Sequence, residues 1–517
     1  MNDAERDGCP PAEVDVLIVG AGISGIGTAY HLKTERPGTS FAVVEARDSI
    51  GGTWDLFRYP GVRSDSDLHT LGFEFNPWRK KHSYAGGEEI LEYLHETVAA
   101  HGLAPYLHLG HRVVRARFSS DTGRWTVTLR HTHDGQDQEG GEHTVTCRFL
   151  FSATGYYDYD EGYTPPFEGR DEFRGRIVHP QFWPDDLDHR GKRVVVIGSG
   201  ATAVTLVPAL AEDAAHVTML QRSPSYVLVW PRENKVVHLL RSTLPEEWAD
   251  RAVRRLSVRL LHELYRTSRR APGLFKAFLR RRMTRVLPDD YPVDVHFNPS
   301  YEPWDQRLCV APDADLFEVI AAGTASVVTD RIERFTPTGI ALESGRELEA
   351  DIVVTATGLK MLPFGRIDLE VDGTPVDLHE CITYKATMLT GVPNYAFAFG
   401  YTNSSWTLKV DLAGHHLCRL LDHMDRRGYA VVTPVCDDPA VGGEPFWDLT
   451  SNYILRAKDM FPQSGSDGPW SMEQNYYLDR ARLIEQPVDH PALRFERVVP
   501  AARVPAGQPT SEERTGT

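Results

Sequence analysis

The sequence predicts an α/β fold with two separate strand–turn–helix units of the doubly wound type and a helical insert in the second unit. Two apolar strand patterns, residues 14–19 and 193–197, each run directly into a glycine cluster that opens a helical pattern. A later apolar strand in each unit ends in Ala-Thr-Gly, at residues 153–155 and 356–358. A buried strand followed by a glycine turn and a helix is the usual start of a parallel sheet, so the repeat predicts two such sheets.

Length, charge and cysteine content narrow the classes of protein. The 517 residues exceed one ordinary core and fit two or three domains. A formal net charge of −16 disfavours a nucleic-acid partner. The six cysteines have neither a CxxC motif nor a metal-like spacing, so we expect reduced thiols and no metal site. We find no signal-peptide pattern and no apolar run near the roughly 20 residues of a membrane span, and we expect a cytoplasmic protein.

Further elements follow in chain order from the periodicity of apolar residues. After the first glycine turn we expect a helix to about Leu32, a strand at 41–45 and an antiparallel meander at 112–151. The α/β alternation stops between the second unit and residue 325, where Trp, Pro and Arg are frequent. We therefore divide the chain into a first domain of residues 12–160 and 381–500, a second domain of 161–225 and 325–380, a helical insert of 226–324 and a disordered tail of 501–517.

The first glycine turn, Gly20-Ala-Gly22-Ile-Ser-Gly25, is the fingerprint of a Rossmann-like dinucleotide site. Gly20 permits the tight turn, Gly22 lets the backbone approach a pyrophosphate, and Gly25 lets helix and strand pack closely. The helix N-terminus offers N–H groups to the phosphates. Glu45 ends the second strand, where its carboxylate can accept hydrogen bonds from the unphosphorylated ribose that both FAD and NAD carry.

The segment after this unit has two interpretations. Gly51-Gly-Thr-Trp54 and the following Arg58–Asp65 stretch are, in one, a glycine loop and a turn with a solvated Asp65. In the other, the loop is a backbone wall against which a flavin lies, and Asp65 points to its ring.

The second glycine turn, Gly198-Ser-Gly200-Ala-Thr-Ala203, repeats the pattern with alanine in the third position. Where Glu45 stands in the first unit, this unit has Arg222-Ser223. An arginine cannot accept from a free 2′-hydroxyl, but it can bind a 2′-phosphate through charge-assisted hydrogen bonds. The second site is therefore predicted to prefer NADPH, the alternative being an ordinary surface arginine.

A motif between the two units carries a resemblance to a known family. Phe173, Gly175, His179 and Trp183-Pro184 match FxGxxxHxxxW(P/D), the fingerprint of type I Baeyer–Villiger monooxygenases. Segments along nearly the whole chain, among them residues 52–61, 195–210, 218–224, 303–309 and 400–409, are most similar to the ethionamide-activating subgroup of FAD-containing monooxygenases.

The resemblance implies FAD in the first domain, NADPH in the second, and a linker role for His179. It makes Arg307 the active-site arginine with Asp65 as its partner. Gln306 stands where many members carry a lysine that helps to hold the 2′-phosphate. The predicted cofactor contacts are Gly20, Gly22, Ser24, Gly25, Glu45, Gly52, Thr53, Trp54, Asp55, Asp65, Val113, Gly198, Ser199, Gly200, Ala201, Thr202, Ala203, Arg222 and Ser223.

The implied reaction uses NADPH and O₂ to convert a small-molecule ketone into an ester or lactone, and it extends to sulfides and thioamides. A flavin-containing N- or S-hydroxylating monooxygenase is the main alternative, against which only Trp183-Pro184 and Arg307 argue. A disulfide reductase needs a redox cysteine pair, which the sequence lacks. A flavin-binding sensor would not require the second site.

An arginine-rich stretch at 251–285 contains twelve Lys or Arg and one acidic residue, Glu263. Val253, Leu256, Leu260 and Leu264 fall at helical spacing. We interpret the stretch as a solvated helical subdomain neutralised by acidic neighbours. The alternative is a basic amphipathic surface that rests on anionic lipid.

Overall fold

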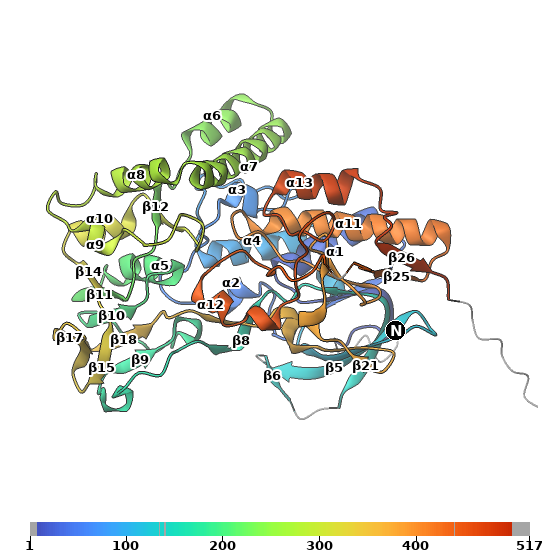
Figure 1. The fold of residues 1–517 in the computed structure, drawn as a ribbon, viewed down its shortest axis with the longest axis horizontal. Helices are drawn as coiled ribbons and strands as arrows, with labels where there is room; N and C mark the ends of the chain where they lie inside the picture. The colour runs from blue at the N-terminus through green and yellow to red at the C-terminus, as the bar shows by residue number, and fades with distance from the viewer. Residues whose placement is uncertain (1–7, 134, 139–140, 439, 499–517) are drawn as a thin grey trace, which may run out of the picture.

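Two sheets, one at each end of the molecule, organise the fold (Figure 1). The computed structural model describes residues 8–133, 135–138, 141–438 and 440–498, so the predicted tail 501–517 lies outside the described residues. The helices of the insert lie along the upper edge in this view, above the second sheet and reaching toward the first.

The first sheet contains the parallel unit that the sequence predicts. β1 (Glu13–Val19) pairs in parallel with β2 (Phe41–Val44) and β7 (His143–Ser152), and α1 (Ile23–Glu35) follows β1. All four side chains of β2 are buried, as expected of a strand covered on both faces. The sheet order is β21-β20-β4-β5-β7-β1-β2-β3, with β3 (Leu107–His108) at one edge.

The predicted meander is confirmed as three antiparallel strands on the same sheet, β4 (His111–Ser119), β5 (Arg124–His133) and β7. Alternate residues of β5 from Trp125 to Leu129 are fully buried, which is the period-2 pattern of a strand with one face on the core. The short β6 (Gln136–Asp137) pairs with β5, and β24 (Tyr395–Phe397) pairs with β7.

One part of the chain belongs to a different sheet from the one that we predicted. β20 (Asp368–Val371) and β21 (Thr374–Pro375) fall within residues 325–380, which we assigned to the second domain, yet β20 pairs with β4 of the first sheet. β19 (Leu359–Met361), paired with β8 (Tyr157–Gly162), carries the chain back between the sheets. The Leu369 side chain of β20 is thereby buried in the core of the first sheet.

The second sheet is parallel throughout its described strands. Its order is β14-β11-β10-β18-β9, with bounds Ala325–Thr329, His216–Gln221, Arg193–Ile197, Ile352–Thr355 and Arg176–Val178. α5 (Ala201–Leu210) follows β10 and packs on the sheet. A separate antiparallel sheet contains β15 (Ile332–Thr336), β16 (Gly339–Leu342) and β17 (Glu347–Glu349).

The insert is mainly helical, as predicted, with α6 (Lys235–Thr243), α7 (Glu246–Arg270), α8 (Pro272–Met283), α9 (Val293–His296) and α10 (Asp315–Ala321). It also contains a parallel pair that was not predicted, β12 (Val227–Trp230) and β13 (Cys309–Pro312). Both runs are short and mostly apolar, a pattern that suits a buried strand as well as a loop between helices.

Helices and short strands complete the two bodies. α11 (Trp406–Arg427) packs beside α1 and buries residues such as Val410 and Leu417 in the first core. The other elements are α2 (Thr53–Leu56), α3 (Leu68–Leu71), α4 (Gly87–Ala100), α12 (Asn452–Leu455), α13 (Tyr476–Arg480), β22 (Thr383–Tyr384), β23 (Met388–Leu389), β25 (Val431–Pro434) and β26 (Leu493–Glu496). Within the described ranges, no helix combines the length and apolar character needed to cross a bilayer.

Candidate functional site

A cavity of about 1480 Å³ connects the two glycine turns. Most residues predicted from sequence to contact cofactors line it, namely Gly20, Gly22, Ser24, Glu45, Gly52, Thr53, Trp54, Asp65, Val113, Gly198, Ser199, Gly200, Ala201, Thr202, Arg222 and Ser223. Arg307 lines it as well. Gly25, Asp55 and Ala203 do not.

The first turn has the geometry of a pyrophosphate cradle. Gly20 has φ +106°, and a Cβ there would lie 2.6 Å from the Ala153 carbonyl oxygen at the end of β7. A side chain at Gly25 would collide with the Gly20 carbonyl, so Gly25 lets α1 pack against the turn and does not itself face the cavity. The N-terminus of α1 at Ile23 directs its free N–H groups into the cavity.

Glu45 is held beside this turn. Its Oε2 accepts a hydrogen bond from the Ala21 N–H (2.8 Å) and its Oε1 from the Arg47 N–H (3.0 Å). Burial raises the pKa of Glu45, while these two backbone donors oppose the shift. Each oxygen retains a second lone pair, so the carboxylate can also accept from two adjacent ribose hydroxyls.

Asp55 does not line the cavity and binds two arginines. Its buried carboxylate accepts hydrogen bonds from Nη2 (2.7 Å) and Nε (3.0 Å) of Arg47 and from Nη2 of Arg58 (3.2 Å). Although burial opposes the shift, hydrogen bonds from Ser49 and Arg47 lower the pKa of Asp55. Arg47 lines the cavity, so Asp55 acts on the site by orienting that guanidinium.

The second turn repeats the geometry of the first. Gly198 has φ +144°, and a Cβ there would collide with the Ala356 carbonyl that follows β18. A Cβ on Gly200 would meet no described atom within 4 Å, so its backbone borders the open cavity at the start of α5. Ala203, one helical turn inside, is fully buried in the core, which explains why it does not reach the cavity.

Arg222 and Ser223 lie at the cavity rim directly after β11. Both are exposed, and Arg222 has no ion-pair partner among the residues that the structure describes. Gln306 and Arg331 line the same cavity. An exposed, unpaired guanidinium beside a helix N-terminus is suited to bind a phosphate.

Arg456 is a residue at this rim that sequence reasoning missed. Its guanidinium lies 3.4 Å from the centre of the Tyr163 ring, over which it stacks. Burial, and the nearby Arg222, lower the pKa of Arg456. No local motif surrounds position 456, so only the fold brings this second cation to the end of the cavity near Arg222.

Arg307 and Asp65 form a two-bond ion pair inside the cavity. Nε of Arg307 donates to Oδ2 of Asp65 (2.9 Å) and Nη2 donates to Oδ1 (2.8 Å). The Asp65 carboxylate raises the pKa of Arg307 well above its usual value, so the guanidinium stays charged. Its third nitrogen, Nη1, has no hydrogen-bond partner within the described ranges and can donate to a ligand.

Aromatic side chains surround this ion pair. Tyr156, Tyr157 and Tyr453 line the cavity, and the hydroxyls of Tyr156 and Tyr157 lie 2.9 Å apart. Trp406 stacks on Tyr156 and donates through Nε1 to the Ser24 hydroxyl (2.8 Å), so the Ser24 side chain is already engaged. The wall around Arg307 is therefore mainly aromatic.

The fingerprint residues do not line the cavity. They lie near the crossing, the β8–β19 segment where the chain passes between the two sheets. Nε2 of His179 contacts the Gly358 carbonyl (3.2 Å), and its ring packs against Gly162 at the end of β8. Burial lowers the pKa of His179. Phe173 is buried in the core of the second sheet, Trp183 packs on the same body, and a Cβ at Gly175 would collide with the Asp351 carbonyl.

Comparisons with known proteins agree with this geometry. Residues 18–81 match the model of an NAD(P)-binding Rossmann-like domain. FAD-containing monooxygenase EthA of Mycobacterium tuberculosis is 47% identical over 485 residues, which cover 94% of this chain and 98% of that protein. "Probable FAD-binding monooxygenase AlmA" of Acinetobacter baylyi is 45% identical over 487 residues, covering 94% and 96%.

Two solved structures share the fold at low sequence identity. A steroid monooxygenase bound to NADP has a TM-score of 0.70 and 21% identity, and the match covers 94% of this chain and 100% of that one. Cyclohexanone monooxygenase of Rhodococcus sp. Phi1, bound to NADP⁺, has a TM-score of 0.70 and 20% identity with the same coverage. The α/β fold with two nucleotide-type turns predicted from sequence is therefore confirmed.

Proposed function

This chain belongs to the family of FAD-containing monooxygenases, and from that premise we propose that it inserts one oxygen atom of O₂ next to a ketone carbonyl. The product is an ester or lactone, and sulfides and thioamides are further substrates. The observation that carries the proposal is the charged Arg307, held by Asp65 through two hydrogen bonds in the cavity that joins the two turns.

The cavity fits FAD at the first turn and NADPH at the second. Gly22 and Gly200 leave backbone exposed where a pyrophosphate must approach, and Glu45 offers a carboxylate to an unphosphorylated ribose. Arg222, which has no ion-pair partner in the part of the chain that the structure describes, offers a cation to a 2′-phosphate. When bound, the cofactors supply the redox chemistry, in which NADPH provides the electrons and the flavin activates O₂.

The contribution of the chain to the reaction is positioning and charge. Nη1 of Arg307 can donate to the substrate carbonyl oxygen as negative charge develops on it, and such preorganised donors are among the strongest sources of rate enhancement in enzymes. Both oxygens of Asp65 bind the Nε and Nη2 edge of the guanidinium and keep it in one orientation. The positive charge at Nη1 is therefore only partly neutralised. Tyr156, Tyr157 and Tyr453 supply an aromatic lining for the cavity that holds this ion pair.

An N-hydroxylating monooxygenase is less well supported. The relatives at 45% identity and above carry names of FAD-containing or FAD-binding monooxygenases, and the solved neighbours are a steroid and a cyclohexanone monooxygenase. The aromatic wall beside Arg307 suits an apolar substrate better than a charged amine.

Oxygen insertion can be tested with a substrate panel. We expect NADPH consumption under air to rise with linear ketones, cyclic ketones or sulfides, and product analysis to find esters, lactones or sulfoxides in matching amounts. Consumption that yields only hydrogen peroxide with every ketone and sulfide would reject both activities.

Replacement of Glu45 by alanine is expected to weaken FAD binding by about 10-fold to 100-fold, because hydrogen bonds to a charged group contribute roughly 1.5–3 kcal/mol. The measurement is quenching of flavin fluorescence when FAD is added to apoprotein. Glu45→Gln retains the side-chain volume and one acceptor and should lose less affinity. Equal FAD affinity of Glu45→Ala and the unaltered protein would remove Glu45 from the site.

We retain the domain division as a proposal, with β20 and β21 moved to the FAD domain. We also propose that His179 couples the motion of the two domains, supported by its contacts with Gly358 and Gly162 at the crossing. His179→Ala should slow flavin reduction in stopped-flow experiments while leaving FAD affinity unchanged. A reduction rate equal to that of the unaltered enzyme would count against the linker role.

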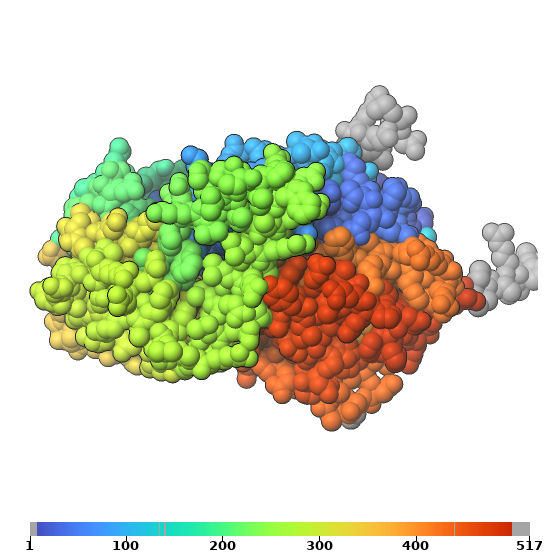
Figure 2. Space-filling view, turned by 90° about the horizontal axis from the view of Figure 1, so that it is seen from above, coloured from blue at the N-terminus to red at the C-terminus, as the bar shows by residue number. Residues whose placement is uncertain are grey.

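We propose that the arginine-rich stretch is a solvated helical subdomain neutralised by acidic neighbours, which the ion pairs of Arg254 with Asp411 and of Arg269 with Asp305 support. As the alternative, we propose that the insert contacts anionic lipid. Its helices form much of the surface turned to the viewer in Figure 2. Trp248 is 66% exposed and Leu274 is 74% exposed, and Leu244 and Trp248 line a small surface hollow with Arg251 and Arg255. Exposed apolar side chains among arginines are typical of helices that lie in a membrane interface.

Vesicle co-sedimentation tests this contact. We expect the protein to pellet with vesicles that contain phosphatidylglycerol, less with pure phosphatidylcholine, and less at high salt. Trp248→Ala should reduce binding about 10-fold, since burying a large apolar side chain contributes roughly 1.5–3 kcal/mol. Met460→Ala, at an exposed position outside the insert, is the control. Binding that ignores both anionic lipid and Trp248 would reject the proposal.

A further inference from the structure

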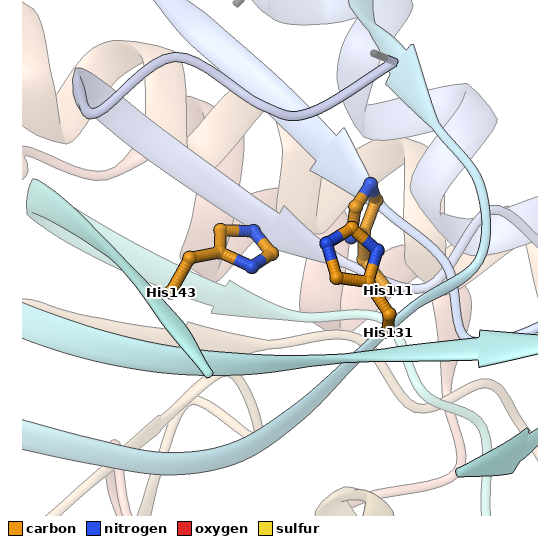
Figure 3. Close-up of side chains that lie close together, drawn as sticks. All are labelled: His111, His131 and His143. Carbon is orange, nitrogen blue, oxygen red and sulfur yellow. The ribbon is translucent and has the colours of Figure 1, made fainter. Parts of the chain in front are cut away.

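Three histidines from three neighbouring strands meet at one end of the first sheet (Figure 3). His111 begins β4, His131 lies near the end of β5, and His143 begins β7. The β4–β5 register places His111 opposite His131, and the β5–β7 register places His143 opposite Leu129, two residues from His131. Since side chains two residues apart share a face, the three rings lie on one face of the sheet.

The rings are close enough to share one ion. The candidate nitrogens all lie within 4.8 Å of one another. The His111 ring centroid is 4.7 Å from that of His131 and 5.1 Å from that of His143, and the last two are 5.1 Å apart. In Figure 3 the His143 ring extends toward the other two. Small side-chain rotations would place one nitrogen of each ring at roughly 2.0–2.1 Å from a shared zinc ion, the usual zinc–nitrogen distance.

Three ring nitrogens of His111 and His143 have no hydrogen-bond partner among the described residues. His111 is 3% exposed, and its Nδ1 has no partner among the described residues. Neither ring nitrogen of His143 has one either. A buried nitrogen without a partner is destabilising, so the open nitrogens are an independent sign that the cluster binds something.

The second nitrogen of His111 is arranged as in known metal sites. Nε2 lies 3.3 Å from the Gly8 carbonyl oxygen, to which it can donate. A histidine that donates one ring N–H to a backbone carbonyl presents its other nitrogen, here Nδ1, as a lone-pair donor of fixed orientation.

A second group of potential ligands in the described residues lacks these features. Nδ1 atoms of His31 and His415 both contact Oε1 of Glu35 (2.8 and 2.6 Å), and Nε2 of His31 contacts Asp411 (3.4 Å). This group is a satisfied ion-pair network. It therefore supplies a control histidine, His415, rather than a second site.

We propose that His111, His131 and His143 form a binding site for a divalent transition-metal ion, with zinc as the preferred ion. Three imidazole nitrogens are suitable ligands for Zn²⁺, Co²⁺, Ni²⁺ or Cu²⁺, whereas Mg²⁺ and Ca²⁺ prefer oxygen ligands. The scattered cysteines led us to expect no metal, and the histidine spacing of 20 and 12 residues matches no short ligand motif. Only the strand register assembles the set.

The site is connected to the first glycine turn through the backbone. The His111 N–H donates to the Glu45 carbonyl (2.8 Å), and the Glu45 N–H donates to the His108 carbonyl (3.0 Å). An ion that fixes the start of β4 therefore also restrains the backbone of Glu45. From this we expect bound zinc to slow the release of FAD, a consequence that alone rests on the proposed function.

The binding itself is tested on the holoenzyme without any substrate. Chelator-treated holoenzyme is dialysed against Zn²⁺ and its metal content measured, and Co²⁺ is titrated while its visible absorption bands are recorded. We expect one tight equivalent of Zn²⁺, a Co²⁺ spectrum of a nitrogen-ligated ion, and a rise in Tm with Zn²⁺.

Variants distinguish this site from the other surface histidines. His143→Ala and the milder His131→Gln should each weaken the tight Zn²⁺ equivalent by on the order of 100-fold and abolish the Tm shift, whereas His415→Ala should leave both unchanged. Far-ultraviolet circular dichroism and retained flavin identify any variant that fails to fold, and His131→Gln, at a half-buried position, keeps the test open in that case. Equal Zn²⁺ affinity of the unaltered protein and a folded His131→Gln or His143→Ala variant would overturn the site.

Discussion

Replacement of Arg307 by alanine is expected to lower ester or lactone formation by about 10²–10³-fold, as removal of one preorganised donor at a developing negative charge does in other enzymes. Flavin reduction by NADPH should persist, because the Arg307 guanidinium binds Asp65 and is not the group that we assign to the 2′-phosphate. The variant should therefore consume NADPH under air and release hydrogen peroxide. Stopped-flow reduction and product analysis measure the two steps separately.

Two further variants, Arg307→Lys and Asp65→Asn, show whether the charge of Arg307 or its orientation accounts for the loss of product. Arg307→Lys keeps the positive charge but cannot form the two-bond contact with Asp65, so we expect a partial loss of product. Asp65→Asn should leave Arg307 charged but less well oriented, and it should raise the hydrogen peroxide yield. Normal ketone oxidation by Arg307→Ala would exclude Arg307 from the reaction.

Replacement of Arg222 by alanine is expected to raise KM for NADPH by about 10-fold to 100-fold, since hydrogen bonds between charged groups contribute roughly 1.5–3 kcal/mol. KM for NADH should barely change, because NADH lacks the 2′-phosphate. The ratio of kcat/KM for the two nucleotides is the measurement, since a general folding defect would lower both values together.

Gln306→Lys is the matched gain-of-function test of the same rim. Gln306 lines the cavity at the position where the family resemblance implies a lysine, so an added ammonium there should lower KM for NADPH. Arg190→Ala, at an exposed arginine that does not line the cavity, is the control for loss of a surface arginine. If Arg222→Ala leaves the NADPH preference intact, the 2′-phosphate is held by other residues, with Arg456 the nearest candidate.

The predictions that succeeded from sequence were those of local geometry. A strand that meets Gly20 or Gly198 must turn with a positive φ, and the helix that follows begins within three residues, so both turns could be located from residue order alone. The positions of Glu45 and Arg222 just after the second strand of each unit follow from the same short-range register. The contacts of Asp55 with Arg47 and Arg58 could not be predicted, because a single carboxylate in a glycine loop gives no sign of which arginines will enclose it.

By itself, then, the sequence determined the two nucleotide-type turns, the position of Arg222 directly after the second strand of the second unit, and the family to which the chain belongs. Only the tertiary structure decided that Arg307 lies on Asp65, that Arg456 stacks on Tyr163, that β20 joins the first sheet, and that three histidines face one another. The physical reason is the separation, along the chain, of the residues that interact. Turns and helix starts depend on backbone sterics within a few residues, whereas these contacts join segments far apart in the chain, or strands whose register the loops do not reveal, and they form only when the sheets pack.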